Sequence, residues 1–259
     1  MTAAVRALLF KEIREGRWKF AIAALVLMAV GVSVPLAYEM FGGVLGELLE
    51  DARIPQFLKE LLPPDMLQMD TYLWSNWHAK NLYQTVVVVA IIFGSSAVAG
   101  EFSRGSAQYL FSRPVTRRSV VLAKTGIDLL WIALAALLGT LALDITGRLA
   151  HGYAVPWTFY AGLVPILAGG AFVYGLALVV STRLDDSVKA GVLAAVVAAL
   201  FSIPSWVPAW RSFSVYVQMT GRALYRDGAF PWLPVLVMVA LAAGLVAAAA
   251  ERLEKRDIA

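Results

Sequence analysis

Long apolar stretches separated by shorter charged segments recur along the whole chain. A helix needs about 20 apolar residues to cross the roughly 30 Å hydrocarbon core of a bilayer, and six stretches reach about that length. An isolated strand could not satisfy its backbone hydrogen bonds in hydrocarbon, so each stretch is expected to be helical. The pattern predicts an all-α integral membrane protein with six spans, at 20–38, 82–100, 125–146, 157–182, 190–210 and 230–250.

Positive charges are divided unequally between the two sides of this layout. Fifteen of the 22 Lys and Arg residues lie in the segments that share a side with the termini, and seven lie in the other connections. Cytoplasmic segments of membrane proteins carry an excess of Lys and Arg. Both termini are therefore expected in the cytoplasm, and residues 1–259 are expected to form a single transmembrane domain.

The charged residues before the first span belong to an amphipathic pattern. Apolar residues recur there at helical spacing, with basic residues between them. This pattern predicts an N-terminal amphipathic helix at the inner membrane surface, although it also fits a plain basic anchor for the first span. The apolar positions are Val5, Leu8, Leu9 and Ile13, and the basic ones are Arg6, Lys11, Arg14 and Arg17.

The long connection at 39–81 also has amphipathic character. Its apolar residues predict one or two short helices at the outer surface, on either side of Pro55. Trp74 and Trp77 are expected in the headgroup layer, where indole rings gather.

Composition narrows the range of functions. Charged residues make up only 15% of the chain, against about 25% in soluble proteins. The absence of cysteine excludes thiolate catalysis, iron–sulfur clusters and cysteine zinc sites. The two histidines, His78 and His151, lie far apart without ligand-spaced companions. We therefore predict no catalytic, cofactor-binding or metal-binding residues and no enzyme activity in this chain.

The segment 101–124, between the second and third spans, is the most unusual part of the sequence. It begins at Glu101, continues through a Gly105-Ser106 step to an apolar patch at 109–111, and reaches Thr116, which could cap a new helix. We expect a short cytoplasmic helix that folds back against the membrane. Its arginines and aromatics suit docking of another protein, although an ordinary basic loop on anionic lipids would look similar.

This segment resembles the permease subunits of type-2 ABC exporters. The run Phe10-Lys11-Glu12-Ile13-Arg14 is similar to the entry helix of that family, and the length, six spans and inward termini also agree. The positions that carry the resemblance are Glu101, Gly105, Ser106, Leu110, Ser112, Pro114, Val115, Thr116, Arg117 and Lys124.

The resemblance implies a dimer of membrane subunits, identical or closely paralogous, above two separate ABC ATP-binding subunits in a bacterial cytoplasmic membrane. ATP and magnesium would bind to that partner, in line with the absence of a phosphate-binding loop motif from this sequence. A second, smaller contact would involve Arg183, Asp185 and Asp186. The coupling loop would dock through Glu101, Arg104, Gly105, Tyr109, Leu110, Phe111, Pro114, Arg117, Arg118 and Lys124.

Two acids lie within the predicted spans. Asp128 is four residues from Lys124, and Asp144 is four residues from Arg148, so each can form an ion pair on one helix face. Alternatively, an acid within the membrane can relay protons or ions. A stand-alone secondary transporter, a channel or a membrane scaffold is the alternative function, and the apolar spans favour an amphipathic substrate.

Overall fold

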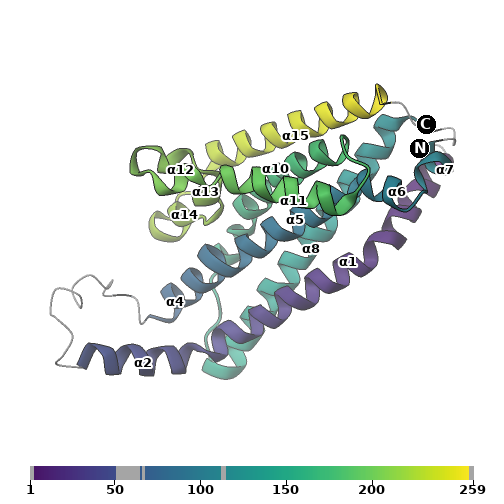
Figure 1. The fold of residues 1–259 in the computed structure, drawn as a ribbon. Helices are drawn as coiled ribbons and strands as arrows, with labels where there is room; N and C mark the ends of the chain where they lie inside the picture. The colour runs from purple at the N-terminus through teal and green to yellow at the C-terminus, as the bar shows by residue number, and fades with distance from the viewer. Residues whose placement is uncertain (1–2, 51–64, 66–67, 112–114, 257–259) are drawn as a thin grey trace.

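The computed structural model describes residues 3–50, 65, 68–111 and 115–256. Across these ranges the chain is helical, with no β-strand, as the sequence predicts. Long helices lie side by side, and both chain ends lie at one end of the bundle (Figure 1). We call this the proximal end. The opposite end, which carries α2 (Tyr38–Glu50), is the distal end.

Five helices in the described ranges are long and apolar enough to cross a membrane. They correspond to the first, third, fourth, fifth and sixth predicted spans. Their apolar stretches run over Arg6–Leu36, Arg117–His151, Trp157–Ser181, Ser187–Trp206 and Trp232–Glu254. The helices that make them are α1 (Ala3–Leu36), α8 (Arg117–His151), α9 (Trp157–Ala161), α10 (Leu163–Ser181), α11 (Ser187–Leu200), α12 (Ile203–Trp206) and α15 (Trp232–Glu254).

The predicted span at 82–100 is built differently. Helix α5 (Tyr83–Ala97) has 15 residues, which is shorter than a complete span. It continues α4 (Met69–Asn76) through the π-helical segment η1 (Trp77–Leu82) and is followed by α6 (Ala99–Ser103). Helix α5 packs against α10, α11 and α8, so it lies inside the bundle. That it crosses the membrane as a sixth span stays a prediction.

The N-terminal residues form one element with the first span. Helix α1 runs for 34 residues without interruption, and at about 1.5 Å per residue it is about 50 Å long. This exceeds the roughly 30 Å hydrocarbon core. The structure thus shows one helix where the sequence predicts two elements, and the expected position of the N-terminal part at the membrane surface stays a prediction.

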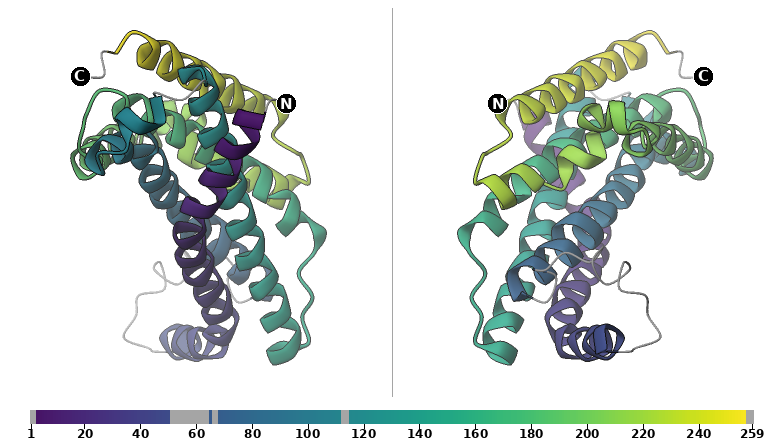
Figure 2. Two further views of the ribbon diagram at one scale, coloured as in Figure 1. Left: turned by 90° about the vertical axis from the view of Figure 1, so that its right-hand side faces the viewer. Right: turned by 90° about the vertical axis from the view of Figure 1, so that its left-hand side faces the viewer.

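Glycines allow the central helices to approach closely. A Cβ on Gly31 of α1 would lie 2.3 Å from the carbonyl oxygen of Gly139 on α8. A Cβ on Gly94 of α5 would lie 2.6 Å from the carbonyl oxygen of Tyr174 on α10. Small residues at such crossings are the usual means of packing helices in membranes. The α1–α8 and α5–α10 pairs therefore pack closely, and Figure 2 shows α1 (purple) beside α8 (teal).

The π-helical segment places bulky rings in the core. Trp77 donates a hydrogen bond from its ring nitrogen to the Thr140 hydroxyl (3.1 Å), and His78 lies 2.8 Å from the carbonyl oxygen of Phe159. Trp74 stacks on His78 and is also buried. The expected position of Trp74 and Trp77 in the headgroup layer is therefore wrong, because both rings are buried inside the protein. Helix α2 confirms the first predicted helix of the 39–81 connection, and the second lies outside the described residues.

Candidate functional site

The segment after α5 folds back at the proximal end. Ser181, the last residue of α10, accepts hydrogen bonds from the backbone NH groups of Val98 and Ala99 (3.0 and 2.8 Å), which holds the bend between α5 and α6. Gly105 has a φ of +68°, a conformation that favours glycine, and it reverses the chain toward α7 (Ala107–Phe111). Thr116 then caps α8 by accepting a hydrogen bond from the Ser119 NH, as the sequence predicts.

Three ionised side chains from three helices meet beneath this loop. The Lys124 Nζ lies 2.7 Å from Glu101 Oε1 and 2.8 Å from Glu12 Oε2. All three residues are buried. Lys11 and Ser106 donate further hydrogen bonds to the Glu101 carboxylate (2.8 and 2.5 Å). We call Glu12, Glu101 and Lys124 the buried ion cluster. It joins α1, α6 and α8 at one point.

Glu101 is held in its ionised form. Burial alone would raise the pKa of its carboxyl group. The charge of Lys124 and the hydrogen bonds from Lys11, Lys124 and Ser106 outweigh this effect and lower the pKa of Glu101 to about 2. Because a buried charge without a partner is very unfavourable, the three side chains of the cluster depend on one another.

The structure divides the predicted docking residues into two groups. Glu101, Leu110 and Lys124 are buried and hold the loop from behind, which corrects their expected place on a docking surface. Arg104, Gly105, Tyr109 and Arg118 are exposed, and the Tyr109 side chain is 67% accessible. The side chain of Phe111 and the whole of Pro114 lie outside the described residues.

The loop at 182–186, between α10 and α11, is bound to the folded-back segment after α5. The Ser103 hydroxyl donates to the Asp185 carbonyl oxygen and accepts from the Ser187 NH, both at 3.0 Å. The Asp186 carboxylate caps α11 by accepting from the NH groups of Lys189 and Val188, and these bonds lower its pKa. Arg183 is exposed beside these residues.

Arginines attach the end of α15 to both loops. Arg117 donates to the carbonyl oxygens of Leu253 (2.8 Å), Glu254 (3.3 Å) and Arg256. Arg256 in turn donates to the Thr182 carbonyl oxygen (2.9 Å), pairs with the Asp185 carboxylate and lies over the Phe102 ring. Arg117, expected to dock a partner, thus binds the last helix. The partners of Arg117 are more than 130 positions away and Thr182 and Asp185 are more than 70 positions from Arg256, so no spacing rule could predict these contacts.

The two acids within the spans have different partners from each other. Asp144 accepts two hydrogen bonds from Arg148 (2.9 and 3.0 Å), so the expected ion pair is present. Lys124 pairs with Glu12 and Glu101, so the expected Lys124–Asp128 ion pair is wrong. Asp128 instead accepts a hydrogen bond from the Tyr174 hydroxyl (3.0 Å).

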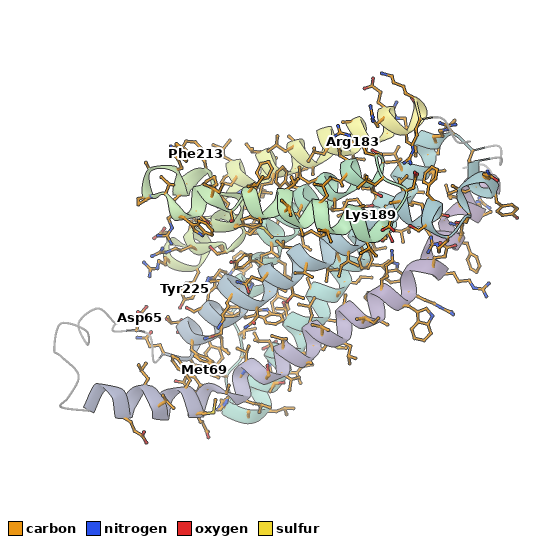
Figure 3. The ribbon with its side chains drawn as sticks, in the orientation of Figure 1. Asp65, Met69, Arg183, Lys189, Phe213 and Tyr225 are labelled. Atoms are coloured by element: carbon orange, nitrogen blue, oxygen red, sulfur yellow. The ribbon has the colours of Figure 1, made fainter. Side chains whose placement is uncertain are left out.

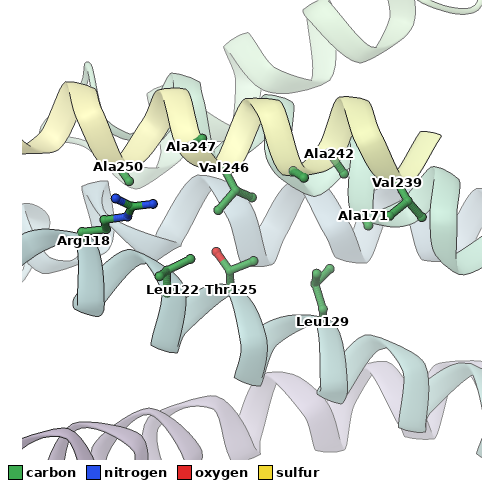
Figure 4. Close-up of a pocket in the computed structure, with 11 residues that line it drawn as sticks. Arg118, Leu122, Thr125, Leu129, Ala171, Val239, Ala242, Val246, Ala247 and Ala250 are labelled. Atoms are coloured by element: carbon green, nitrogen blue, oxygen red, sulfur yellow. The ribbon is translucent and has the colours of Figure 1, made fainter. Parts of the chain in front are cut away.

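An apolar pocket of about 400 Å³ opens between α8, α10 and α15. In Figure 4, Leu122, Thr125 and Leu129 line it from α8, opposite small residues of α15, and Arg118 lies at one end. A pocket with these walls can accommodate a hydrocarbon chain, with a cation beside one end of it.

Long apolar helices with a folded-back, charged loop at one end define a multi-pass membrane protein. Residues 7–209 match the family model described as ABC-2 family transporter protein. This match covers well over half of the chain, so the protein belongs to the ABC-2 transporter family, whose members are membrane permeases of ABC transporters. No curated protein matches the chain.

Proposed function

We propose that this chain is the permease subunit of an ATP-driven exporter. In this proposal two copies, or one copy and a close paralogue, form the translocation path in the cell membrane, with both termini in the cytoplasm and α5 completing a sixth span. Two ATP-binding subunits dock beneath, where they hold ATP and magnesium. The observation that supports the proposal is the α6–α7 loop, which exposes Arg104 and Tyr109 and is fixed from behind by buried residues.

The contacts behind the loop give a route for mechanical coupling. The buried ion cluster ties α6 to α1 and α8. Ser103 ties the same loop to the start of α11, and Arg117 ties the start of α8 to the end of α15. Closure of the ATP-binding subunits against α6–α7 would therefore displace several membrane helices together. An amphipathic substrate would be moved outward in this step.

Docking can be tested with one exposed aromatic side chain at each end of the molecule. Tyr109 lies on α7 at the proximal end, and Phe213, 80% exposed, lies at the distal end (Figure 3). Tyr109→Asp is expected to reduce co-purification of the co-expressed ATP-binding subunit about tenfold, because it places a charge at the centre of an interface. Phe213→Asp, the matched control, is expected to leave co-purification unchanged. Equal recovery of the complex with both variants would contradict the proposal.

Asp128 supports the alternative of a proton-coupled transporter, because it is an acid within a span that contacts a tyrosine hydroxyl. Asp128→Asn separates the two functions. An exporter driven by a partner should keep its substrate-stimulated ATP hydrolysis, whereas proton-coupled transport should be abolished without any effect of ATP.

A further inference from the structure

The distal end carries a group of arginines with a different environment from those at the proximal end. Arg211 comes from η2 (Pro208–Phe213), and Arg222 and Arg226 come from α14 (Arg222–Asp227). All three line one pocket of about 300 Å³. Arginine is depleted on the outer side of membrane proteins, yet three of the seven basic residues that the sequence assigns to that side surround this single pocket.

Arg222 and Arg226 are positioned by an aromatic platform, Trp74 and Tyr225. Tyr225 stacks on Trp74 with the ring centres 4.9 Å apart and the planes 12° apart. The Tyr225 and Thr71 hydroxyls lie 2.7 Å apart. Gly221, with a φ of +62°, begins α14 against the Trp74 ring, where a Cβ would lie 3.3 Å away. Arg222 and Arg226 are four residues apart and therefore share one face of α14. The platform thus fixes the helix that carries two of the three charges.

The positive charge in this pocket is not neutralised by contact. Within the described residues, none of the three arginines lies within ion-pair distance of a carboxylate, although Asp65 also lines the pocket and Asp227 lines the adjoining one. Asp65 accepts a hydrogen bond from Thr71 instead. Among the residues that line the pocket, three arginines therefore accompany one aspartate, while Asp70 lies beside Tyr225 and Asp227 lines the adjoining pocket. At the proximal end, by contrast, Arg117 and Arg256 are bonded to carbonyl oxygens and Asp185.

We propose that this pocket, Arg211, Arg222, Arg226, Trp74 and Tyr225, is a binding site for the phosphate group of an anionic amphiphile. The planar fork of an arginine matches a phosphate through paired hydrogen bonds. Exposed aromatic side chains lie close to Arg211 along the chain, namely Trp210 and Phe213 on η2 and Trp206 at the end of α12. They provide an apolar surface for the hydrocarbon part of the ligand. The site is additional to the proposed transport function, and its test does not require the ATP-binding subunit.

The experiment is calorimetric titration of the full-length protein in a neutral detergent with three probes. These are dihexanoyl phosphatidylglycerol, dihexanoyl phosphatidylcholine and inorganic phosphate. The double variant Arg222→Gln/Arg226→Gln is expected to bind phosphatidylglycerol about tenfold or more weakly, since it removes charge-assisted hydrogen bonds. Lys80→Gln, an exposed cation outside the pocket, is the matched control and should change the affinity by less than about twofold.

The probes also distinguish the source of the phosphate group. Arginine-dependent binding of phosphatidylglycerol alone supports a lipid headgroup, and arginine-dependent binding of inorganic phosphate as well supports a site that also takes the free anion. Equal binding by wild type and double variant overturns the proposal, as does equal affinity for phosphatidylcholine and phosphatidylglycerol. If the double variant does not fold, Arg211→Gln, on a separate segment, is judged by the same criteria.

Discussion

The two ends of the molecule use charged side chains in opposite ways. At the proximal end Glu12, Glu101 and Lys124 are buried and paired, and Arg117 and Arg256 are bonded to the protein itself. At the distal end three arginines line an open pocket without an ion pair in the described part of the chain. Paired and buried charges fix one arrangement of helices, whereas solvated charges around a pocket remain available to a ligand. The comparison predicts that mutations in the buried ion cluster change stability and that mutations of the distal arginines change binding.

Loss of Lys124 should have the largest effect. Lys124→Met leaves the carboxylates of Glu12 and Glu101 buried without their shared cation, and should lower the free energy of unfolding by about 3–5 kcal/mol. Unfolding followed by circular dichroism in detergent measures this loss. Lys11→Met is the control, because Lys11 is more exposed and contacts the same Glu101 oxygen. Adding Glu101→Gln to Lys124→Met should restore part of the stability. Equal losses for Lys124→Met and Lys11→Met would contradict the role given to the cluster.

Acid should weaken the same cluster. The pKa of Glu101 falls from 4.5 in the unfolded chain to about 2 in the folded protein. Its contribution to stability is therefore complete above pH 4.5 and disappears as the pH falls toward 2. We expect a loss of about 2–3 kcal/mol over this interval, after allowance for solvent screening. Unfolding measured from pH 6 to pH 2 should show a flatter profile for Glu101→Gln, and an unchanged profile would sink this prediction.

A smaller effect is expected where Arg117 binds the end of α15. Arg117→Gln removes hydrogen bonds to carbonyl oxygens and should cost about 1–2 kcal/mol. Amide hydrogen exchange should increase at the C-terminal end of α15, because its attachment is lost. The adjacent Arg118→Gln removes the same charge from an exposed position and serves as the control. Equal exchange in the two variants would show that these bonds do not hold α15.

The smallest effect is expected at the distal end. Arg222→Gln/Arg226→Gln removes two exposed charges that have no ion pair among the described residues. Its free energy of unfolding should stay within about 0.5 kcal/mol of wild type, as is usual for surface substitutions. A loss as large as that of Lys124→Met would mean that the two ends do not differ in the way described above.

The sequence predicts features that depend on neighbouring residues and on the length of apolar runs. The helical class, five long spans, the Thr116 cap and the Asp144–Arg148 pair all follow from local rules. For Lys124, the local rule predicts the wrong partner. Its spacing to Asp128 favours an ion pair on one helix face, yet Glu12 and Glu101 lie closer in space because α1 and α6 pack against α8. A partner 112 residues away can be found only once the packing of the helices is known.

The sequence predicts where the folded-back segment lies, but not which of its side chains face the protein. The folded-back segment is where the sequence places it, because a span ends at Glu101 and a helix can begin after Thr116. The sequence does not tell which side of so short a helix faces the protein. Leu110 is buried and Tyr109 is exposed, although both belong to the same apolar patch. The distal arginines were also missed as a group, because they come from two short helices whose approach depends on the Trp74 platform.

The wide turn at Trp77–Leu82 limits how the length of this helix can vary among related chains. Each residue of an α-helix rotates the chain by about 100°. Deleting one residue here would restore an ordinary turn and rotate α4 against α5 by that angle. Trp74 would then leave its place under Tyr225, and one wall of the arginine pocket would be lost. Relatives that bind the same ligand should therefore tolerate side-chain replacements in this stretch more readily than single-residue insertions or deletions.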